Sequence, residues 1–132
     1  MPSLTDRASI ARRSFEAWNA ADIEGLVAIM DPEVEVRALI TRLDGVPYRG
    51  HDGVRRWHRD AMESFDFFHV TTDEVREVGD RVVALGRMRT RGHDSGVELE
   101  QPIAWVMEFR GERILRSEVF PDHESALRAA SA

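Results

Sequence analysis

Apolar residues recur three or four positions apart through much of the first half of the chain, which is the spacing of one helical face. Residues 4–20 carry such a stripe, with arginines and a glutamate between its members. Asp22 can cap a second short helix that ends before Asp31-Pro32. A third helix is predicted at residues 51–65, with its stripe formed by Val54, Trp57, Ala61 and Phe65. The first half is therefore predicted to be mainly helical.

Apolar and polar residues alternate through the second half, which is the two-residue period of a β-strand. Shorter strands are predicted at 33–39 and 46–50, before the third helix. The long predicted strands are 68–78, 81–91, 97–109 and 113–120, and a short helix is predicted at 124–130. No repeat, linker or low-complexity tract divides residues 1–132. This order predicts one domain of the α+β class.

The last predicted strand places two opposite charges among apolar residues. By strict alternation, Arg116 and Glu118 share one face with Ile114 and Phe120. Burial of a charge is costly unless the charge is paired and hydrogen-bonded. The pair therefore belongs either in a polar pocket or at a solvated rim.

The strand at 97–109 is apolar on both faces over several residues. Ile103, Trp105 and Met107 alternate with Ala104 and Val106, so both sides of the sheet need a cover. Helices can cover one side, and a second copy of the chain, in a two-fold homodimer through the sheet face, can cover the other. The alternative is that the C-terminal segment covers it.

Composition and charge narrow the class further. The 132 residues are 42% hydrophobic, which suffices for one domain with a core. Eighteen basic and 24 acidic residues are mixed along the chain and leave a net charge of −6, so nucleic acid is not an expected partner. The lack of cysteine excludes disulfides and thiolate metal sites. With neither a secretory signal nor a long apolar span, a cytoplasmic protein without membrane contact is expected.

Four passages together resemble the nuclear transport factor 2-like superfamily and, within it, the SnoaL-like (polyketide cyclase-like) proteins. They are FEAWNAADIEGLVAIMDPEVEV, YRGHDGV, GVELEQP and VFPD, and the resemblance covers nearly the whole chain. It implies a cone-shaped α+β barrel in which a curved mixed or antiparallel sheet wraps around the three helices of the N-terminal half and encloses one deep cavity. Such proteins include ketosteroid isomerases, polyketide cyclases, dehydratases, epoxide hydrolases and non-catalytic binding proteins, so the fold alone does not decide the activity.

The chain departs from the isomerase pattern within this resemblance. Ser14, Arg37 and Ala104 stand where the resemblance places the oxyanion tyrosine, the general base and the protonated aspartate. That chemistry needs a carboxylate base and two strong donors that converge on one oxygen, so this route is not expected here. The acidic residue of the aldol-type cyclases corresponds to Asp122 or Glu118.

The candidate site residues follow from placing the Ala104 face of its strand inward, together with Pro102 and Val106. The last strand then contributes Arg116, Glu118 and Phe120. The predicted catalytic residues are His58, Arg116, Glu118 and Asp122, and the predicted ligand-binding residues are Trp18, Arg37, Trp57, Met62, Glu100 and Phe120. The histidines lack metal-ligand spacing and no phosphate-binding loop is present, so neither a metal nor a cofactor is expected.

Three functions remain open at this point. A cofactor-independent acid/base enzyme would use His58 or Glu118 to move a proton and Arg116 or Arg37 to stabilise negative charge on a small, partly apolar, oxygenated substrate. A non-catalytic protein would bind a small hydrophobic metabolite in the same cavity. A dimeric scaffold would have no pocket larger than a few waters. Structural roles are the competing hypotheses for Asp122 as a helix cap and for Arg116 with Glu118 as an ion pair within the strand.

Overall fold

One open six-stranded sheet and four helices make up the part of the chain that the structure describes. The structure is a computed structural model, and it describes residues 6–39, 41 and 45–132. The helices are α1 (Arg7–Asn19), α2 (Ile23–Ala28), α4 (Gly50–Ser64) and α5 (His123–Ser131). The strands are β1 (Met30–Arg37), β2 (Tyr48–Arg49), β3 (Phe65–Val78), β4 (Arg81–Gly92), β5 (Glu98–Arg110) and β6 (Arg113–Phe120). Most predicted elements are present, and β3 begins at Phe65, three residues before its predicted start.

Aspartate side chains begin three of the four helices. Asp6 accepts a hydrogen bond from the backbone N–H of Ala8, and Asp22 accepts one from Gly25. Such N-caps satisfy backbone donors that the first helical turn leaves free. The capping role predicted for Asp22 is confirmed.

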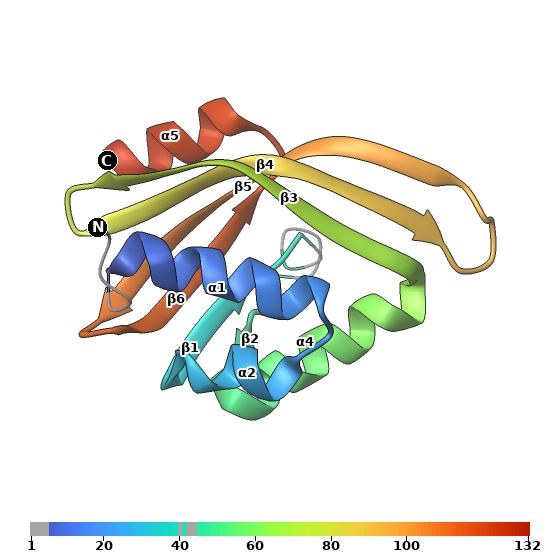
Figure 1. Cartoon of the computed structure of the whole chain (residues 1–132), viewed down its shortest axis with the longest axis horizontal. Helices are drawn as coiled ribbons and strands as arrows, with labels where there is room; N and C mark the ends of the chain where they lie inside the picture. Colours follow the sequence, from blue (N-terminus) through green and yellow to red (C-terminus); the bar gives the residue numbers. More distant parts are fainter. Residues whose placement is uncertain (1–5, 40, 42–44) are drawn as a thin grey trace.

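The sheet is mixed, with the strand order β2-β1-β6-β5-β4-β3. Only β1 and β6 pair in parallel, and the other neighbours are antiparallel. Figure 1 shows α1, α2 and α4 on the concave face of the curved sheet and α5 on the opposite face. The predicted α+β fold, with a curved sheet around the helices of the first half, is confirmed.

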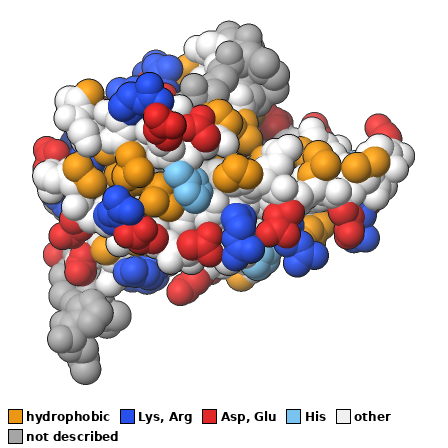
Figure 2. Space-filling view, turned by 90° about the horizontal axis from the view of Figure 1, so that it is seen from above, with side chains coloured by type: hydrophobic (Ala, Val, Ile, Leu, Met, Phe, Trp, Pro, Cys, Tyr) orange, Lys and Arg blue, Asp and Glu red, His pale blue; other side chains and the backbone are white. Residues whose placement is uncertain are grey.

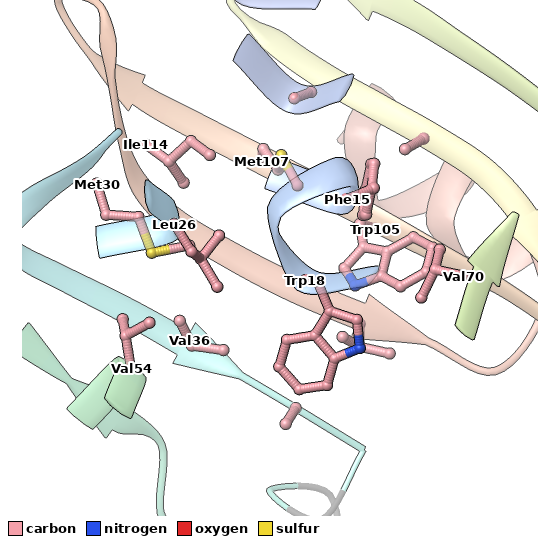
Figure 3. Packing of buried hydrophobic residues seen from close by; sticks show 14 of the residues in the cluster. Phe15, Trp18, Leu26, Met30, Val36, Val54, Val70, Trp105, Met107 and Ile114 are labelled. Atoms are coloured by element: carbon pink, nitrogen blue, oxygen red, sulfur yellow. The ribbon is translucent and has the colours of Figure 1, made fainter. Parts of the chain in front are cut away.

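The inner face of the sheet carries the main hydrophobic core. Ile103, Trp105 and Met107 of β5 pack with α1, α2 and the inner residues of β1 (Figure 3). Ring centroids of Phe15 and Trp105 lie 4.6 Å apart, which ties α1 to the middle of the sheet. Burial of these side chains holds the helices against the concave face.

The outer face of β5 is covered by α5. Ala104 and Val106 form a second buried cluster with Phe120 of β6 and with Ala126 and Ala130 of α5. The alternative that the C-terminal segment covers this face is therefore confirmed. It removes part of the reason for expecting a second copy of the chain there.

A β-bulge in β6 determines which of its side chains face the core. Ile114 pairs with Phe109, but the next pair is Arg116 with Glu108, so Leu115 is an extra residue on β6. Ile114 is fully buried on the inner face, whereas Phe120 packs under α5 on the outer face. The prediction that Ile114, Arg116, Glu118 and Phe120 share one inward face is wrong, because the bulge moves every later residue to the other side.

The predicted inward register of β5 is wrong for a related reason. Ala104 and Val106 lie on the outer face, and Ile103, Trp105 and Met107 lie on the inner face. Both sets are apolar and buried, so composition could not distinguish them. Pro102 and Glu100 are exposed.

Candidate functional site

A cavity of about 490 Å³ lies between the inner face of the sheet and the helices. Its walls are mainly apolar and aromatic, with Phe15 and Trp18 from α1, Trp57 from α4, and Ile103 and Trp105 from β5. Figure 3 shows several of these rings beside one another. This size is within the range of about 300–1,000 Å³ that is typical of small-molecule sites.

Few polar side chains reach this cavity, and two of them form a pair. Tyr48 of β2 donates a hydrogen bond from its hydroxyl to Asp60 Oδ2 of α4, with an oxygen–oxygen distance of 2.8 Å. Ser14, Ser64 and Ser117 also line it, and the hydroxyl of Ser14 donates to the carbonyl of Ala11. Asp60 is the only carboxylate among the described residues that line the cavity.

Asp60 reaches the cavity because of its place on α4. Trp57, Asp60, Ala61 and Ser64 line the cavity at helical spacing, three or four residues apart. The helical spacing of apolar residues predicted the stripe through Trp57 and Ala61 but did not include Asp60. The signal was present, since Asp60 lies three residues after Trp57, but its charge favoured a solvent-facing position.

The two tryptophans predicted to bind ligand both line the cavity. Trp18 and Trp57 have ring centroids 4.5 Å apart. His58 and Met62 lie on the flank of α4 and are not among the lining residues. The ring centroids of His58 and Trp18 lie 5.3 Å apart, with the two rings nearly perpendicular. The indole N–H of Trp18 is buried and has no acceptor among the described residues.

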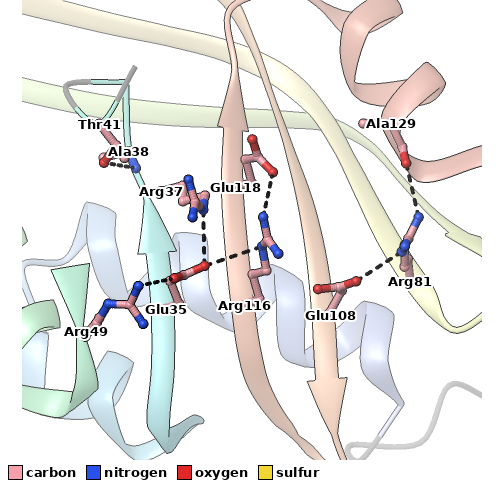
Figure 4. Close-up of polar contacts among 10 residues, drawn as sticks. All are labelled: Glu35, Arg37, Ala38, Thr41, Arg49, Arg81, Glu108, Arg116, Glu118 and Ala129. Atoms are coloured by element: carbon pink, nitrogen blue, oxygen red, sulfur yellow. Dashed lines mark hydrogen bonds and ion pairs between the residues drawn. The ribbon is translucent and has the colours of Figure 1, made fainter. Parts of the chain in front are cut away.

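Arg37, Arg116 and Glu118 lie on the outer face of the sheet, away from this cavity. Glu35 joins three strands there, since it contacts Arg49 at 3.0 Å, Arg37 at 3.1 Å and Arg116 at 3.6 Å. Arg116 contacts Glu118 at 3.5 Å. Figure 4 shows these side chains as one row across β2, β1 and β6. The expectation that Arg37, Arg116 and Glu118 would line the main cavity is wrong.

This outer row continues as a small polar hollow near the end of α5. The hollow, of about 120 Å³, is lined by Arg81, Glu108, Arg116 and Glu118, among others. Arg81 contacts Glu108 at 3.2 Å and donates to carbonyls at the end of α5, including that of Ala129 (Figure 4). These charges satisfy one another, so they support the ion-pair hypothesis for Arg116 and Glu118.

The remaining predicted site residues also lie outside the main cavity. Asp122 caps α5, because its carboxylate accepts from the N–H and the hydroxyl of Ser125. Glu100 is exposed and pairs with Arg87 at 3.0 Å. Phe120 is buried beneath α5. The structure therefore does not bring the four predicted catalytic residues to one point.

The three positions compared with those of ketosteroid isomerases do not lie together in the structure. Ser14 lines the cavity, but Arg37 and Ala104 lie on the outer face. Their inward neighbours are apolar, namely Val36 and Ala38 in and after β1, and Ile103 and Trp105 in β5. None of these described positions offers the carboxylates that the isomerase route requires.

Titration of two histidines, His58 and His93, is expected to change the stability of the protein with pH in opposite directions. Burial lowers the pKa of His58, so the unfolded state binds more protons and stability falls as the pH drops below about 6.5. The hydrogen bond to Asp66 raises the pKa of His93, so its contribution is present below about 6.5 and is lost as the pH rises through the folded-state pKa. In urea unfolding at pH 5.0 and pH 7.5, His58→Gln is expected to lose less stability on acidification than the wild type.

The variant His93→Gln provides the opposite control for this measurement. It is expected to be destabilised at pH 5.0 more than at high pH, because it lacks the charged partner of Asp66. If His58→Gln lost as much stability as the wild type between the two pH values, the lowered pKa of the partly buried His58 would be contradicted.

Charges of both signs are mixed over the rest of the described surface. Figure 2 shows acidic and basic side chains next to each other on the face seen from above. Arg87 pairs with Asp73, and Arg76 with Glu74. No described helix has the length and apolarity needed to cross a membrane. No group of three or more potential metal ligands occurs among the described residues.

The open, curved sheet, the helices on its concave face and the apolar cavity between them define a small α+β protein of the nuclear transport factor 2-like fold. The SnoaL-like domain family matches residues 11–117, and the chain belongs to this family. None of the curated proteins matches the sequence.

Solved structures with the same fold cover nearly the whole chain. A nuclear transport factor 2-like protein of unknown function from Burkholderia pseudomallei K96243 is 25% identical, with a TM-score of 0.79, and the match covers 96% of this chain and 98% of that chain. TerC, co-crystallised with polyporic acid, is 20% identical, with a TM-score of 0.77 and coverage of 96% and 98%. A protein with a ketosteroid isomerase-like fold from Catenulispora acidiphila DSM 44928, in complex with trimethylamine, is 17% identical, with a TM-score of 0.76 and coverage of 92% and 91%.

Proposed function

We propose that the protein binds a small, mainly apolar molecule with an oxygen or nitrogen function in the cavity between the sheet and the helices. The observation that carries this proposal is the cavity itself, of about 490 Å³, with aromatic walls and a single Tyr48–Asp60 polar pair among its described lining. Small-molecule sites combine such apolar walls with a few placed polar groups. A scaffold without a ligand would not need a space many times larger than one water molecule.

Two of the similar structures support a small-molecule function. TerC was crystallised with polyporic acid, and the Catenulispora acidiphila protein with trimethylamine. The membership of this chain in the SnoaL-like family is consistent with a site of the same general kind. The identity of the ligand does not carry over at these levels of sequence identity.

Cofactor-independent acid/base catalysis is the second candidate, and Asp60 is the observation that favours it. A carboxylate held in an apolar cavity can take or return a proton, and the Tyr48 hydroxyl holds one of its oxygens in place. In this second proposal Asp60 would move the proton, in place of His58, Glu118 or Asp122. Reactions of the isomerase, cyclase, dehydratase or epoxide hydrolase type would all use such a group.

A homodimer through the outer sheet face and a cytoplasmic location stay predictions. The part of that face not packed under α5 carries the row of Glu35, Arg37, Arg116 and Glu118. An interface built on this row would bury paired charges, so its strength would depend on ionic strength.

Filling the cavity tests the proposal directly. Ala61 lines the cavity from α4, and Ala61→Phe is expected to weaken the binding of the neutral fluorescent probe N-phenyl-1-naphthylamine by about tenfold or more, because the new ring occupies the space of the ligand. The matched control Arg59→Phe adds the same ring at an exposed position of the same helix and should bind the probe like the wild type. Equal binding by all three proteins would reject the cavity as the binding site.

A further inference from the structure

The described walls of the cavity carry charge of one sign only. Asp60 is the one charged side chain among the described lining residues, and no described arginine or histidine reaches the lining. Arg56 approaches the pair from the Tyr48 side, with its guanidinium carbon 5.4 Å from the centre of the Tyr48 ring. Arg56 is exposed and is not part of the lining. A ligand inside the cavity therefore meets a carboxylate without a described basic side chain beside it.

The hydrogen bond within the pair determines what Asp60 offers to a ligand. Tyr48 donates to Oδ2, and no described side chain donates to Oδ1. A carboxylate is an acceptor, so Oδ1 selects a ligand group that donates. A donor that also carries positive charge makes a stronger bond than a neutral donor.

Aromatic rings line the same cavity as this acceptor. Ring centroids of Trp18 lie 4.5 Å from Trp57 and 5.3 Å from Phe68, and Phe65 lies 5.5 Å from Phe68. All four rings line the cavity, as does Tyr48. Aromatic faces attract cations and also pack against apolar groups. An anionic group gains no such attraction from the ring faces and is repelled by Asp60.

We propose that the cavity selects a cationic amine with an apolar body, whose ammonium group donates to Asp60 Oδ1 while its hydrocarbon part fills the aromatic space. This inference rests on the proposed ligand-binding function and specifies the chemical class of the ligand. The ligand is then a positively charged nitrogen compound, whereas the sequence alone predicted an oxygenated substrate held by arginines.

Three probes of the same shape and different charge test this selection. The series is 2-naphthylmethylamine, 2-naphthalenemethanol and 2-naphthoate, and their dissociation constants are measured by isothermal titration calorimetry at pH 7. The amine is expected to bind about tenfold tighter than the alcohol, and the naphthoate more weakly than both. The variant Asp60→Asn keeps an oxygen that can accept from Tyr48 and removes the charge. It is expected to bind amine and alcohol equally, with the affinity for the alcohol changed by no more than about twofold.

A control on the same helix separates local charge from net charge. Glu63 is exposed on α4, so Glu63→Gln makes the same change in net charge outside the cavity and should keep the amine preference of the wild type. Should Asp60→Asn fail to fold, Asp60→Ser also removes the charge and is likewise expected to bind amine and alcohol equally.

The outcomes distinguish this inference from the function on which it rests. Equal binding of amine and alcohol by the wild type, or tighter binding of the naphthoate, would overturn the amine selection and leave the binding function intact. Loss of the preference in Glu63→Gln, or its retention in the Asp60 variant without the charge, would also overturn it. Absence of binding for all three probes together with N-phenyl-1-naphthylamine would remove the proposed function itself.

Discussion

Substitution of Gly86 by alanine is expected to destabilise the protein by about 3 kcal/mol or more, because a side chain at this position has no space. A Cβ atom on Gly86 would lie 2.1 Å from the carbonyl oxygen of Thr71 and 3.2 Å from Cα of Thr72. Both contacts are to backbone of β3, which is paired with β4 on one side, while β5 pairs with β4 on the other. Because the clashing atoms belong to the backbone, no side-chain rotation can relieve the clash. The paired strands β3 and β4 would have to move apart.

Urea unfolding followed by circular dichroism measures this loss, and Gly92→Ala is the matched control. Gly92 ends the same strand, and a Cβ there would meet mainly the terminal oxygen of the Ser95 side chain, which can rotate away. The control is expected to lose less than about 1 kcal/mol. If Gly86→Ala were as stable as Gly92→Ala, this result would contradict the close approach of the β3 backbone at Thr71 to Gly86.

Truncation of Trp105 to alanine is the second large effect, with an expected loss of about 3–5 kcal/mol. Trp105 is only 4% exposed, lies at the centre of β5 and packs on Phe15 of α1. Its removal leaves a space that joins the existing cavity, so the surrounding side chains cannot close it by small movements. The free energy of unfolding in urea measures the loss.

Trp57→Ala separates packing from ligand contact in the same assay. Trp57 also lines the cavity but is only half-buried on α4, so its truncation is expected to cost less stability than that of Trp105. It is expected to weaken binding of N-phenyl-1-naphthylamine, because it removes an aromatic wall. Equal losses of stability in the two variants would contradict the central packing role of Trp105.

Periodicity was sufficient for the elements and for much of the fold. The helical stripes of α1 and α4 and the alternation of β3 to β6 come from the local chain, and each pattern is visible within about a dozen residues. The two apolar faces of β5 also predicted covers on both sides of the sheet. What the sequence left open was the identity of the second cover, because Ala126 and Ala130 of α5 are small and form a weak apolar signal.

The site was less predictable because its register depends on pairing between strands. Strict alternation placed Arg116 and Glu118 inward, and a single extra residue at Leu115 places them outward. The local sequence Arg-Ile-Leu-Arg-Ser-Glu contains no glycine to indicate the bulge. The sequence left two positions open for this charge pair, a polar pocket or a solvated rim. Only the pairing of β6 with β5 decides between them.

Asp60 illustrates the opposite case, in which a local signal was present but its residue type was misleading. Its helical spacing from Trp57 predicts a shared face, but charged residues usually face solvent. The hydrogen bond from Tyr48, twelve residues earlier, explains why this carboxylate is tolerated at the cavity wall. Such a partner can be recognised only when β2 and α4 are placed together.

The extra residue at Leu115 also governs how this strand can diverge among related proteins. On its C-terminal side, Ser117 and Val119 point into the cavity while Arg116 and Glu118 point out. Within β6, deletion of one residue before Arg116 could be absorbed by straightening the bulge. Deletion of one residue after Arg116 would instead move charged side chains to the inner face and apolar ones to the outer face. An ungapped alignment through residues 113–120 with a relative lacking the bulge would therefore equate positions on opposite faces, and apparent losses of acidic residues in this strand would be differences of register.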